Sequence, residues 1–277
     1  MTRLTTDDVL IITDNWKVYD GCQRRMLGVD LPTLAARAVG RDPARVAAAL
    51  AGRKLAAVSI TEGEGIISGF AESLAAIGRR LGLTAEAMTR ANREGLKEAE
   101  LWGADLVIYA TDDRFLALNP HNGQVADNNP ATSRVFVAAL ELMAEDQTLA
   151  GREVVVLGLG IIGRGAAGRL VELGARPLMY DPDPGCRAAA AKVVGDGGEV
   201  LPDNDSLARA LTRTNLIFEA VCCRRALPPE LWPLNPVVAA PGVPLSWPQE
   251  WLRGCGGGRL WHDQLQSGTA AMLAELA

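Results

Sequence analysis

The first eighty residues combine two spacings of apolar positions. Residues 1–52 place apolar side chains three and four positions apart, and the segments LPTLAARAV and PARVAAALA each begin near a proline suited to a first helical turn. The run 54–60 is continuously apolar and short, which is typical of a buried strand, and helical spacing returns over 66–81. The pattern therefore predicts a helical opening followed by an α/β unit.

The alternation continues toward the middle of the chain. Helical spacing over 84–101 leads to two apolar runs, 104–110 and 114–119, which we expect to be strands. The HNGQ segment that follows contains Asn-Gly, a strong turn signal. A helix predicted from about Thr132 to Glu145 then bridges to the second half, so a domain boundary is expected near 126–148.

The second half repeats the order strand, helix, strand. Apolar runs end near Leu157 and Asp181, and further strands are predicted at 215–220, 235–240 and 258–262. We expect an α/β protein with a Rossmann-type, doubly wound parallel sheet and an N-terminal helical α/β domain. The expected domains are 1–130, for substrate, and 131–277, for NAD. The second includes a final helix from about Ser267 to Ala277 that packs back on the body.

The stretch EVVVLGLGIIGRGAAGRLVELGARPLMYD, at 153–181, carries a glycine pattern in its full context. Gly158 permits a tight turn after the strand, Gly160 lets the backbone approach a pyrophosphate, and Gly163 lets the next helix pack closely. Asp181 ends the following strand, where a carboxylate can hold both hydroxyls of a ribose. The motif predicts a bound dinucleotide.

The acidic residue also bears on which dinucleotide binds. A carboxylate accepts hydrogen bonds from a free 2′-hydroxyl and repels a 2′-phosphate, so Asp181 favours NAD over NADP. Arg187 lies a few residues further on, and we interpret it as a solvated residue of the next helix.

Composition narrows the class of protein. The 277 residues are 48% hydrophobic and 22% charged with a net charge of −5, enough for one large or two modest globular domains. Neither a membrane-spanning run nor a secretory signal is visible, so we expect a cytoplasmic protein. The basic residues form no cluster suited to nucleic acid, and the five cysteines show no metal-ligand spacing. Four of the six tryptophans fall in the last 46 residues, which suggests an apolar cover or a homodimer interface.

Four loops that follow predicted strands can carry chemistry, because ligands of such sheets bind outside the carboxyl ends of the strands. They are SITEGEG (59–65), ATDDRF (110–115), ADNNPATS (126–133) and WHDQLQSGTA (261–270). Each also has a structural interpretation. The acidic pair at 112–113 can be a solvated corner, the amides at 128–129 can cap a helix, and Glu62 and Glu64 are expected to be exposed.

Histidines and cysteines in these regions are ambiguous as well. His262 and Asp263 can form a buried hydrogen-bonded pair instead of a proton carrier, and His121 is expected at the surface. Cys222 and Cys223 follow the predicted strand 215–220, next to the expected place of a nicotinamide. A nucleophilic thiol there would indicate aldehyde chemistry, but a small residue lining the cofactor explains Cys222 more simply.

Several of these segments together resemble the pyrrolysine synthase family. The resemblance rests on SITEGEGIISGFAESLAAIG at 59–78, ATDDRFLALNPHNGQVADNNPATS at 110–133, the glycine-rich stretch at 154–175, APGVPL at 240–245 and LWHDQLQSGTAAM at 260–272. It covers most of the chain after residue 58 and is looser before it. The segment around 184–200 is longer than in the family, and we expect this to alter only a surface helix.

The resemblance implies an NAD-dependent oxidation of lysine-Nε-(3-methyl-D-ornithine). In the family the terminal amine becomes an imine, the α-amine attacks it, and loss of ammonia closes the pyrroline ring to give pyrrolysine. It further implies amine binding and proton transfer by Asp113 and Asp263, and contact of Ile161, Ile162 and Cys222 with NAD, besides Gly158 and Asp181. The residues that it implies for the substrate pocket, besides Asp113, are Leu4, Ser59 and Asn128 or Asn129.

Two other functions stay open on the sequence. One is an NAD-dependent oxidoreductase of another amino or 2-hydroxy acid, which would need an arginine clamp for the substrate carboxylate; Arg114 and Arg134 are the candidates. The other is a non-catalytic NAD-binding sensor, in which NAD binding would not respond to changes at Asp113.

Overall fold

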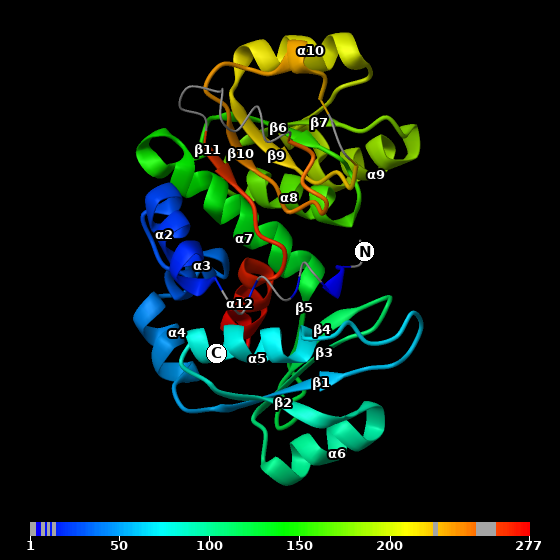
Figure 1. Cartoon of the computed structure of the whole chain (residues 1–277). Helices are drawn as coiled ribbons and strands as arrows, with labels where there is room; N and C mark the ends of the chain where they lie inside the picture. The colour runs from blue at the N-terminus through cyan, green and yellow to red at the C-terminus, as the bar shows by residue number, and fades with distance from the viewer. Residues whose placement is uncertain (1–3, 7–8, 10–11, 13–14, 224–226, 248–258) are drawn as a thin grey trace. The chain divides into compact units, whose positions relative to one another are not determined.

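The computed structural model divides the chain into two units, described separately below (Figure 1). It describes all residues except 1–3, 7–8, 10–11, 13–14, 224–226 and 248–258. Unit 1 comprises Met1–Arg25, Val29–Val135 and Gln264–Ala277, and unit 2 comprises Met26–Gly28 and Phe136–Asp263. The division therefore falls within a helix, and the last helix, which the expected boundaries placed in the second domain, belongs to unit 1.

Unit 1 opens with the expected helices. These are α2 (Trp16–Leu27), α3 (Leu31–Ala38) and α4 (Pro43–Leu50). Asp30 and Asp42 cap α3 and α4 by accepting hydrogen bonds from backbone N–H groups, and a proline follows each in the first turn. A capping carboxylate with proline at the first turn is the local signal that starts a helix, which is why these two boundaries were visible in the sequence.

The sheet of unit 1 has five strands in the order β2-β1-β3-β4-β5. They are β1 (Lys54–Ser59), β2 (Thr84–Ala91), β3 (Leu106–Ala110), β4 (Phe115–Leu118) and β5 (Val125–Asp127). The first three are parallel, whereas β4 is antiparallel to β3 and to β5. Helices α5 (Phe70–Arg80) and α6 (Asn92–Trp102) lie on opposite faces of this sheet (Figure 1).

The helix predicted over 84–101 is wrong in its first half. Residues 84–91 form β2, which pairs with β1 in parallel, and the helix begins only at Asn92. The segment TAEAMTRA is rich in helix formers, but the sheet buries Ala85 and Met88 and leaves Thr84 and Glu86 exposed. Pairing with a neighbouring strand thus overrides local propensity here. The short strand β5, after the Asn-Gly turn, was not predicted either.

Unit 2 contains a six-stranded, fully parallel sheet in the order β11-β10-β9-β6-β7-β8. The strands are β6 (Glu153–Leu157), β7 (Arg176–Tyr180), β8 (Glu199–Val200), β9 (Leu216–Glu219), β10 (Val237–Ala239) and β11 (Arg259–Trp261). When β6 to β11 are renumbered 1 to 6 in chain order and the sheet is read from the β8 edge, the strand order is 3-2-1-4-5-6. This order defines the Rossmann fold. The expected doubly wound sheet is confirmed, and the order reverses between β6 and β9.

Helices connect these strands as the alternating pattern predicted. Unit 2 contains α8 (Ile161–Glu172), α9 (Pro184–Val194) and α10 (Asn204–Arg213), and α7 (Asn128–Met143) crosses the division between the units. One apolar layer of unit 2 joins Leu207, Ala210 and Leu211 of α10 to Val155 and Ile217 of the sheet. This layer is the packing on which the α10 face of the sheet depends.

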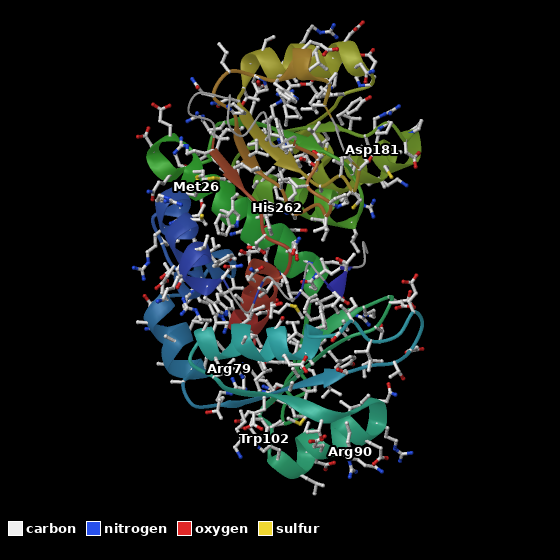
Figure 2. All side chains as sticks on the ribbon, viewed as in Figure 1. Met26, Arg79, Arg90, Trp102, Asp181 and His262 are labelled. Atoms are coloured by element: carbon white, nitrogen blue, oxygen red, sulfur yellow. The ribbon has the colours of Figure 1, made fainter. Side chains whose placement is uncertain are left out.

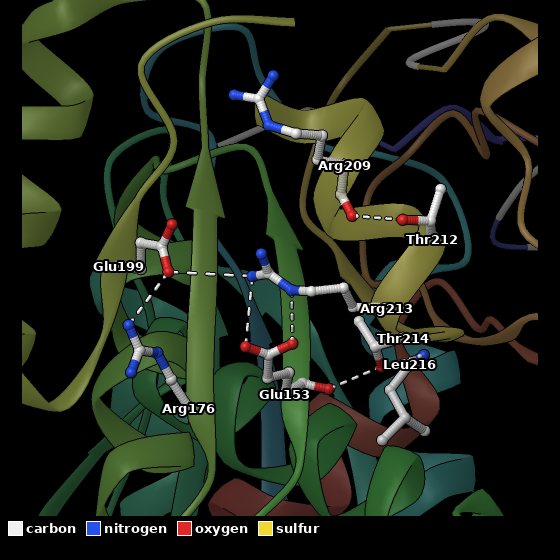
Figure 3. Close-up of polar contacts among 8 residues, drawn as sticks. All are labelled: Glu153, Arg176, Glu199, Arg209, Thr212, Arg213, Thr214 and Leu216. Atoms are coloured by element: carbon white, nitrogen blue, oxygen red, sulfur yellow. Dashed lines mark hydrogen bonds and ion pairs between the residues drawn. The ribbon is translucent and has the colours of Figure 1, made fainter. Parts of the chain in front are cut away.

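The amino ends of the unit 2 strands are held by charged side chains (Figure 3). Arg213 donates to Glu153 at the start of β6, with Nε and Oε2 2.9 Å apart, and also lies 3.9 Å from Glu199. Arg176, at the start of β7, pairs with the same Glu199 at 3.1 Å. These pairs are partly exposed, so each contributes little to stability alone.

The last helix, α12 (Gln266–Glu275), is part of the core of unit 1. Nine of its ten residues are buried, from Gln266 to Ala274. Arg53 donates to the carbonyl oxygen of Leu276 at 3.0 Å, and Arg41 donates to that of Ala277 at 2.6 Å. The expected return of this helix to the body is confirmed.

The tryptophans near the end of the chain are packing residues. Trp247 and Trp261 are 5% and 3% exposed, and the ring of Trp247 lies 6.0 Å from that of half-buried Trp232. Because both Trp247 and Trp261 are buried, the interpretation of this cluster as a dimer interface is wrong for them. Trp251 lies outside the described residues.

Candidate functional site

The glycine-rich turn after β6 is built by steric limits on the backbone. A Cβ atom at Gly163 would lie 1.8 Å from the carbonyl oxygen of Gly158, so only glycine lets α8 pack this close to the turn. Gly158 has φ of +81°, and a Cβ there would lie 2.7 Å from the carbonyl oxygen of Ala220. Gly160, by contrast, has no atom within 4 Å of its Cβ position. The turn thus closes on its inner side and leaves open space at Gly160, at the start of α8.

Asp181 lies directly after β7, beside this turn (Figure 2). Its Oδ2 accepts a hydrogen bond from the backbone N–H of Leu159 at 2.7 Å, and its Oδ1 accepts one from that of Asp183 at 2.9 Å. The side chain is half-buried. Each carboxylate oxygen has two lone pairs, so Asp181 keeps capacity to accept ribose hydroxyls while it is held against the glycine turn. The residues present fit a dinucleotide.

Two arginines stand near this carboxylate, one of which the sequence did not suggest. Arg164, on α8, reaches back to the carbonyl oxygen of Leu159 at 2.8 Å. Arg187, on α9, donates to the carbonyl oxygens of Asp181 and Pro182 at 2.6 and 3.1 Å. Arg187 lies on the next helix, as expected, but it is half-buried and ties α9 to the loop after β7 instead of being fully solvated. No pattern in the sequence signals the backward reach of Arg164.

The remaining residues expected at the cofactor differ in exposure. Ile161 is 59% exposed and Ile162 is half-buried, both in the first turn of α8. Cys222 and its neighbour Cys223 are exposed after the end of β9. Because β6 and β9 are neighbours at the point where the strand order reverses, the loops after them meet at the crevice where Rossmann folds bind ligands.

A buried carboxyl group that sequence analysis missed lies next to this crevice. Glu219, the last residue of β9, is 1% exposed, and its Oε2 accepts a hydrogen bond from Ser246 Oγ at 2.6 Å. Burial raises the pKa of Glu219 from 4.5 to about 7, against the opposing effect of hydrogen bonds from Ser246, Trp247 and the Val221 amide. The signal for it was present, since a single acidic residue interrupts the otherwise apolar run LIFEAV.

In unit 1, three of the residues expected at the substrate gather at one edge of the sheet. Ser59 ends β1, and Asp113 lies in the turn after β3. Asn128 follows β5, which runs in the direction of β3 because β4 between them is antiparallel to both. The carboxyl ends of β1, β3 and β5 therefore bring these side chains to the same edge. Asn129 follows Asn128 at the start of α7.

Hydrogen bonds between loops order this edge. Asp112 Oδ2 accepts from the backbone N–H of Glu64 at 2.9 Å, and Asn92 accepts from that of Thr61 at 2.8 Å. Asp113, in the same turn as Asp112, has an exposed side chain. The acidic pair is thus divided in role: Asp112 joins two loops, and Asp113 is open to solvent. Asn128 also takes part in packing, since its Oδ1 accepts from Thr132 at 3.2 Å.

Asp263 and His262 follow β11 in unit 2. Asp263 is 7% exposed, and His262 (Figure 2) is half-buried with Nδ1 2.7 Å from the carbonyl oxygen of Ala240. This contact makes Nδ1 the protonated nitrogen of a neutral His262 and leaves Nε2 as an acceptor. The bonded partner of His262 is the backbone of the loop after β10.

Neither arginine suggested as a carboxylate clamp is unpaired. Arg114 pairs with Asp127 at 3.2 Å, and Arg134 pairs with Glu275 of α12. His121 is exposed, as expected. Leu4 is half-buried, and nothing places it against the other substrate candidates. Within the described part of the chain, no three His, Cys, Asp or Glu side chains form a metal-binding group, and no helix has the length and apolarity to cross a membrane.

The strand order of unit 2 and the closed glycine turn define a Rossmann-fold protein with an additional α/β domain. A solved shikimate 5-dehydrogenase from Thermus thermophilus, in complex with NADP(H) and shikimate, shares this fold. Its TM-score is 0.51 at 18% identity, over 81% of this chain and 91% of that chain.

Sequence comparison identifies the family. The chain is 32% identical over 273 residues to the pyrrolysine synthase of Methanosarcina acetivorans, covering 99% of this chain and 98% of the relative. It is 29% identical over 275 residues to that of Methanosarcina barkeri, covering 99% and 97%. Residues 9–126 also match the family model of the N-terminal domain of the pyrrolysine biosynthesis protein PylD. The chain belongs to the pyrrolysine synthase family, and the resemblance seen in its sequence is confirmed.

Proposed function

We propose that this chain is an NAD-dependent amine dehydrogenase and cyclase that makes pyrrolysine from lysine-Nε-(3-methyl-D-ornithine). Membership of the pyrrolysine synthase family supports the substrate and product. The single observation that carries the cofactor part is the glycine turn, closed at Gly163 and open at Gly160, with Asp181 held against it. That arrangement suits a pyrophosphate at the start of α8 and a ribose at Asp181.

The carboxylate at position 181 favours NAD over NADP. Its two oxygens already accept hydrogen bonds from backbone amides and present negative charge where a 2′-phosphate would lie. The arginines nearby direct their guanidinium groups to backbone carbonyl oxygens of Leu159, Asp181 and Pro182. We therefore expect NAD to be preferred, with NADP bound more weakly through charge repulsion.

For the substrate, we assign Asp113 and Asp263 to binding the cationic amines and accepting a proton. Hydride leaves readily only from a neutral amine, so the terminal ammonium must first lose a proton to a nearby base. Exposed Asp113 is open to a cationic ligand, whereas buried Asp263 suits a proton acceptor shielded from water. Ser59, Asn128 and Asn129 would orient the substrate through hydrogen bonds, and Leu4 would supply an apolar contact.

Bound NAD would supply the hydride acceptor. The terminal carbon of the ornithine part loses a hydride and its nitrogen a proton, which leaves an imine on the substrate. The α-amine then attacks that carbon and forms a new C–N bond. The bond from the carbon to its original nitrogen breaks, ammonia leaves, and the pyrroline ring is formed. Ring closure within one molecule depends on positioning, which falls to the polar residues of the unit 1 edge.

The test is an assay of the purified full chain with NAD and lysine-Nε-(3-methyl-D-ornithine). We expect reduced nicotinamide by absorbance, one ammonia for each NADH, and a product with the mass of pyrrolysine. NADP should support the reaction at least about tenfold less well, the effect of about 1.4 kcal/mol of repulsion. NADH formation without release of ammonia would contradict the cyclase part. Absence of both NADH and ammonia would contradict the proposed substrate.

The other two functions make different predictions. An oxidoreductase of another amino or 2-hydroxy acid would turn over such acids, but both arginines suggested for a clamp are paired with carboxylates. A non-catalytic sensor would bind NAD and release no product. The same assay, extended to a panel of amino and 2-hydroxy acids, separates all three.

A further inference from the structure

Glu219 is a buried acidic residue that the proposed reaction does not use. It pairs in register with Leu157 of β6, and Ile217, two residues before it on the same face of β9, belongs to the apolar layer under α10. A carboxyl group in such a layer is costly unless hydrogen bonds hold it. Glu219 Oε2 accepts one from Ser246 Oγ at 2.6 Å. Ser246 lies in the segment that follows β10, so this bond joins the end of β9 to that segment.

The loop that Glu219 holds is the wall of the expected cofactor site. Residues 220–223 lie between two close backbone contacts. On one side, Gly158 of the glycine turn meets Ala220, and on the other a Cβ at Gly242 would lie 2.1 Å from the carbonyl oxygen of Val221. The loop includes exposed Cys222, expected beside the nicotinamide. A small displacement of this loop therefore changes the space on the cofactor side.

We propose that Glu219 is a positioning residue for the nicotinamide end of the cofactor site. Its carboxyl group ties the loop 220–223 to the loop 240–247 and so holds the former against the glycine turn. The inference rests on the proposed binding of NAD. Glu219 itself is covered by protein and bonded to Ser246, so it is not a catalytic residue.

The position makes this tether sensitive to pH. Burial raises the pKa of Glu219 to about 7, so the carboxyl group holds a proton more readily when it is buried against Ser246 than when water reaches it. Raising the pH through 7 therefore disfavours the buried position of Glu219, loosens the loop 220–223, and lowers affinity for the cofactor. Affinity falls as the pH rises because the arrangement that binds the cofactor is the one in which Glu219 holds its proton more tightly.

Other ionisable groups near this layer do not replace Glu219 in that role. The helix that covers it, α10, turns Leu207 and Leu211 inward, and its charged residues Asp205, Arg209 and Arg213 are exposed. Within the described residues, β6 carries Glu153 at its opposite end, where Arg213 binds it, and the segments nearer Glu219 carry Tyr180, Cys222, Cys223 and His262. The Tyr180 hydroxyl bonds Asn204, His262 bonds the Ala240 carbonyl, and both cysteines are exposed. Arg224 and Arg225 lie outside the described residues.

The test measures the Kd of the full-length chain for NADH by fluorescence titration at about pH 6 and about pH 8.5. NADH is the probe because its uncharged dihydronicotinamide removes direct attraction to a carboxylate. We expect the wild-type Kd to rise several-fold, up to about tenfold, between the two pH values. Glu219→Gln, which cannot ionise, should abolish that rise and bind as the wild type does at the lower pH.

Three further variants sharpen the result. Ser246→Ala removes one donor without changing charge and should raise Kd at both pH values, and Glu219→Ala should raise it more. Glu153→Gln, a matched loss of charge at the opposite end of the same sheet (Figure 3), should keep the wild-type pH dependence. Near-ultraviolet circular dichroism identifies folded variants, and Ser246→Ala carries the test if substitution at 219 prevents folding.

Two outcomes would overturn the inference, and they are distinct. If NADH binds but Glu219→Gln keeps the wild-type rise, or Ser246→Ala binds as tightly as the wild type, Glu219 does not position the site. If the wild type binds NADH at neither pH, both this inference and the proposed cofactor fail.

Discussion

The two units of the chain place their candidate site residues by different physical means. In unit 2 the turn after β6 has its shape because a Cβ at Gly163 or Gly158 would collide with backbone atoms. In unit 1 the candidates Ser59, Asp113 and Asn128 are ordinary side chains at the edge of a sheet. Steric limits on the backbone admit one residue type, whereas a polar loop admits many. The comparison teaches that a cofactor site can be recognised from spacing, but a substrate site depends on chemistry that spacing does not fix.

The largest effect is expected from a single methyl group added to the glycine turn of unit 2. Gly163→Ala places a Cβ 1.8 Å from the Gly158 carbonyl oxygen, so α8 or the turn must move. We expect a loss of about 3 kcal/mol in the free energy of unfolding and no measurable NAD binding. Chemical denaturation and NADH titration check both.

The matched control is Gly160→Ala, at a position with φ of −63° and open space around its Cβ. The free energy of unfolding should stay within about 0.5 kcal/mol of the wild type, whereas NAD affinity should fall about tenfold because the methyl group takes the space expected for the pyrophosphate. Equal stability of the two alanine variants would contradict the steric account of the turn.

On the unit 1 side, the informative change removes a charge and leaves the fold. Asp113→Asn keeps the size of an exposed side chain, so stability and NAD affinity should match the wild type. The proposed loss of amine binding or proton transfer should lower kcat/KM for lysine-Nε-(3-methyl-D-ornithine) by about 10²-fold or more.

Glu62→Gln is the control for that substitution, since Glu62 is also exposed in a loop after a strand of the same sheet. It should change kcat/KM less than about threefold, the range of ordinary surface substitutions. Equal losses in the two variants would mean that general negative charge, and not Asp113, serves the substrate.

The pH dependence of stability tests the burial of Glu219 itself. The pKa of Glu219 is raised from 4.5 to about 7 on folding, so between these values the folded state holds more protons than the unfolded state. Its contribution to stability is therefore lost as the pH rises through that interval, at a rate of at most about 1.4 kcal/mol per pH unit.

Urea unfolding of the wild type and Glu219→Gln at about pH 5 and about pH 8 isolates this contribution. The wild type should lose more stability than the variant over that range. Parallel pH profiles would show that Glu219 has the same pKa in both states.

The sequence predicted elements wherever one local signal governed the outcome. Proline in the first turn marked α3 and α4, and three glycines after an apolar run marked the turn at β6. It failed at 84–91, where helix-forming residues lie in a strand because β1 supplies the hydrogen-bonding partner. A pairing with a strand about thirty residues away leaves no mark on the local pattern of 84–91.

The candidate site shows the same limit. Asp181 was visible because it ends a strand at a fixed distance from the glycines, and its bond to the Leu159 amide supports that interpretation. Glu219 could be read in the sequence as a single acidic residue among apolar ones, but its role could not, because its partner Ser246 lies 27 residues away. The split between Asp112, which joins two loops, and Asp113, which is exposed, depended on the contact with Glu64.

The burial of α12 in unit 1 has a consequence for biosynthesis on the ribosome. Residues 266–275 fill the core beside α3, yet they are translated after every residue of unit 2. The Rossmann sheet has all its strands by Trp261, while the earlier unit still lacks a central helix. The unit that is begun first therefore waits for a segment made after the strands of the second, and a nascent chain exposes the apolar surface meant for α12 until that helix has been made.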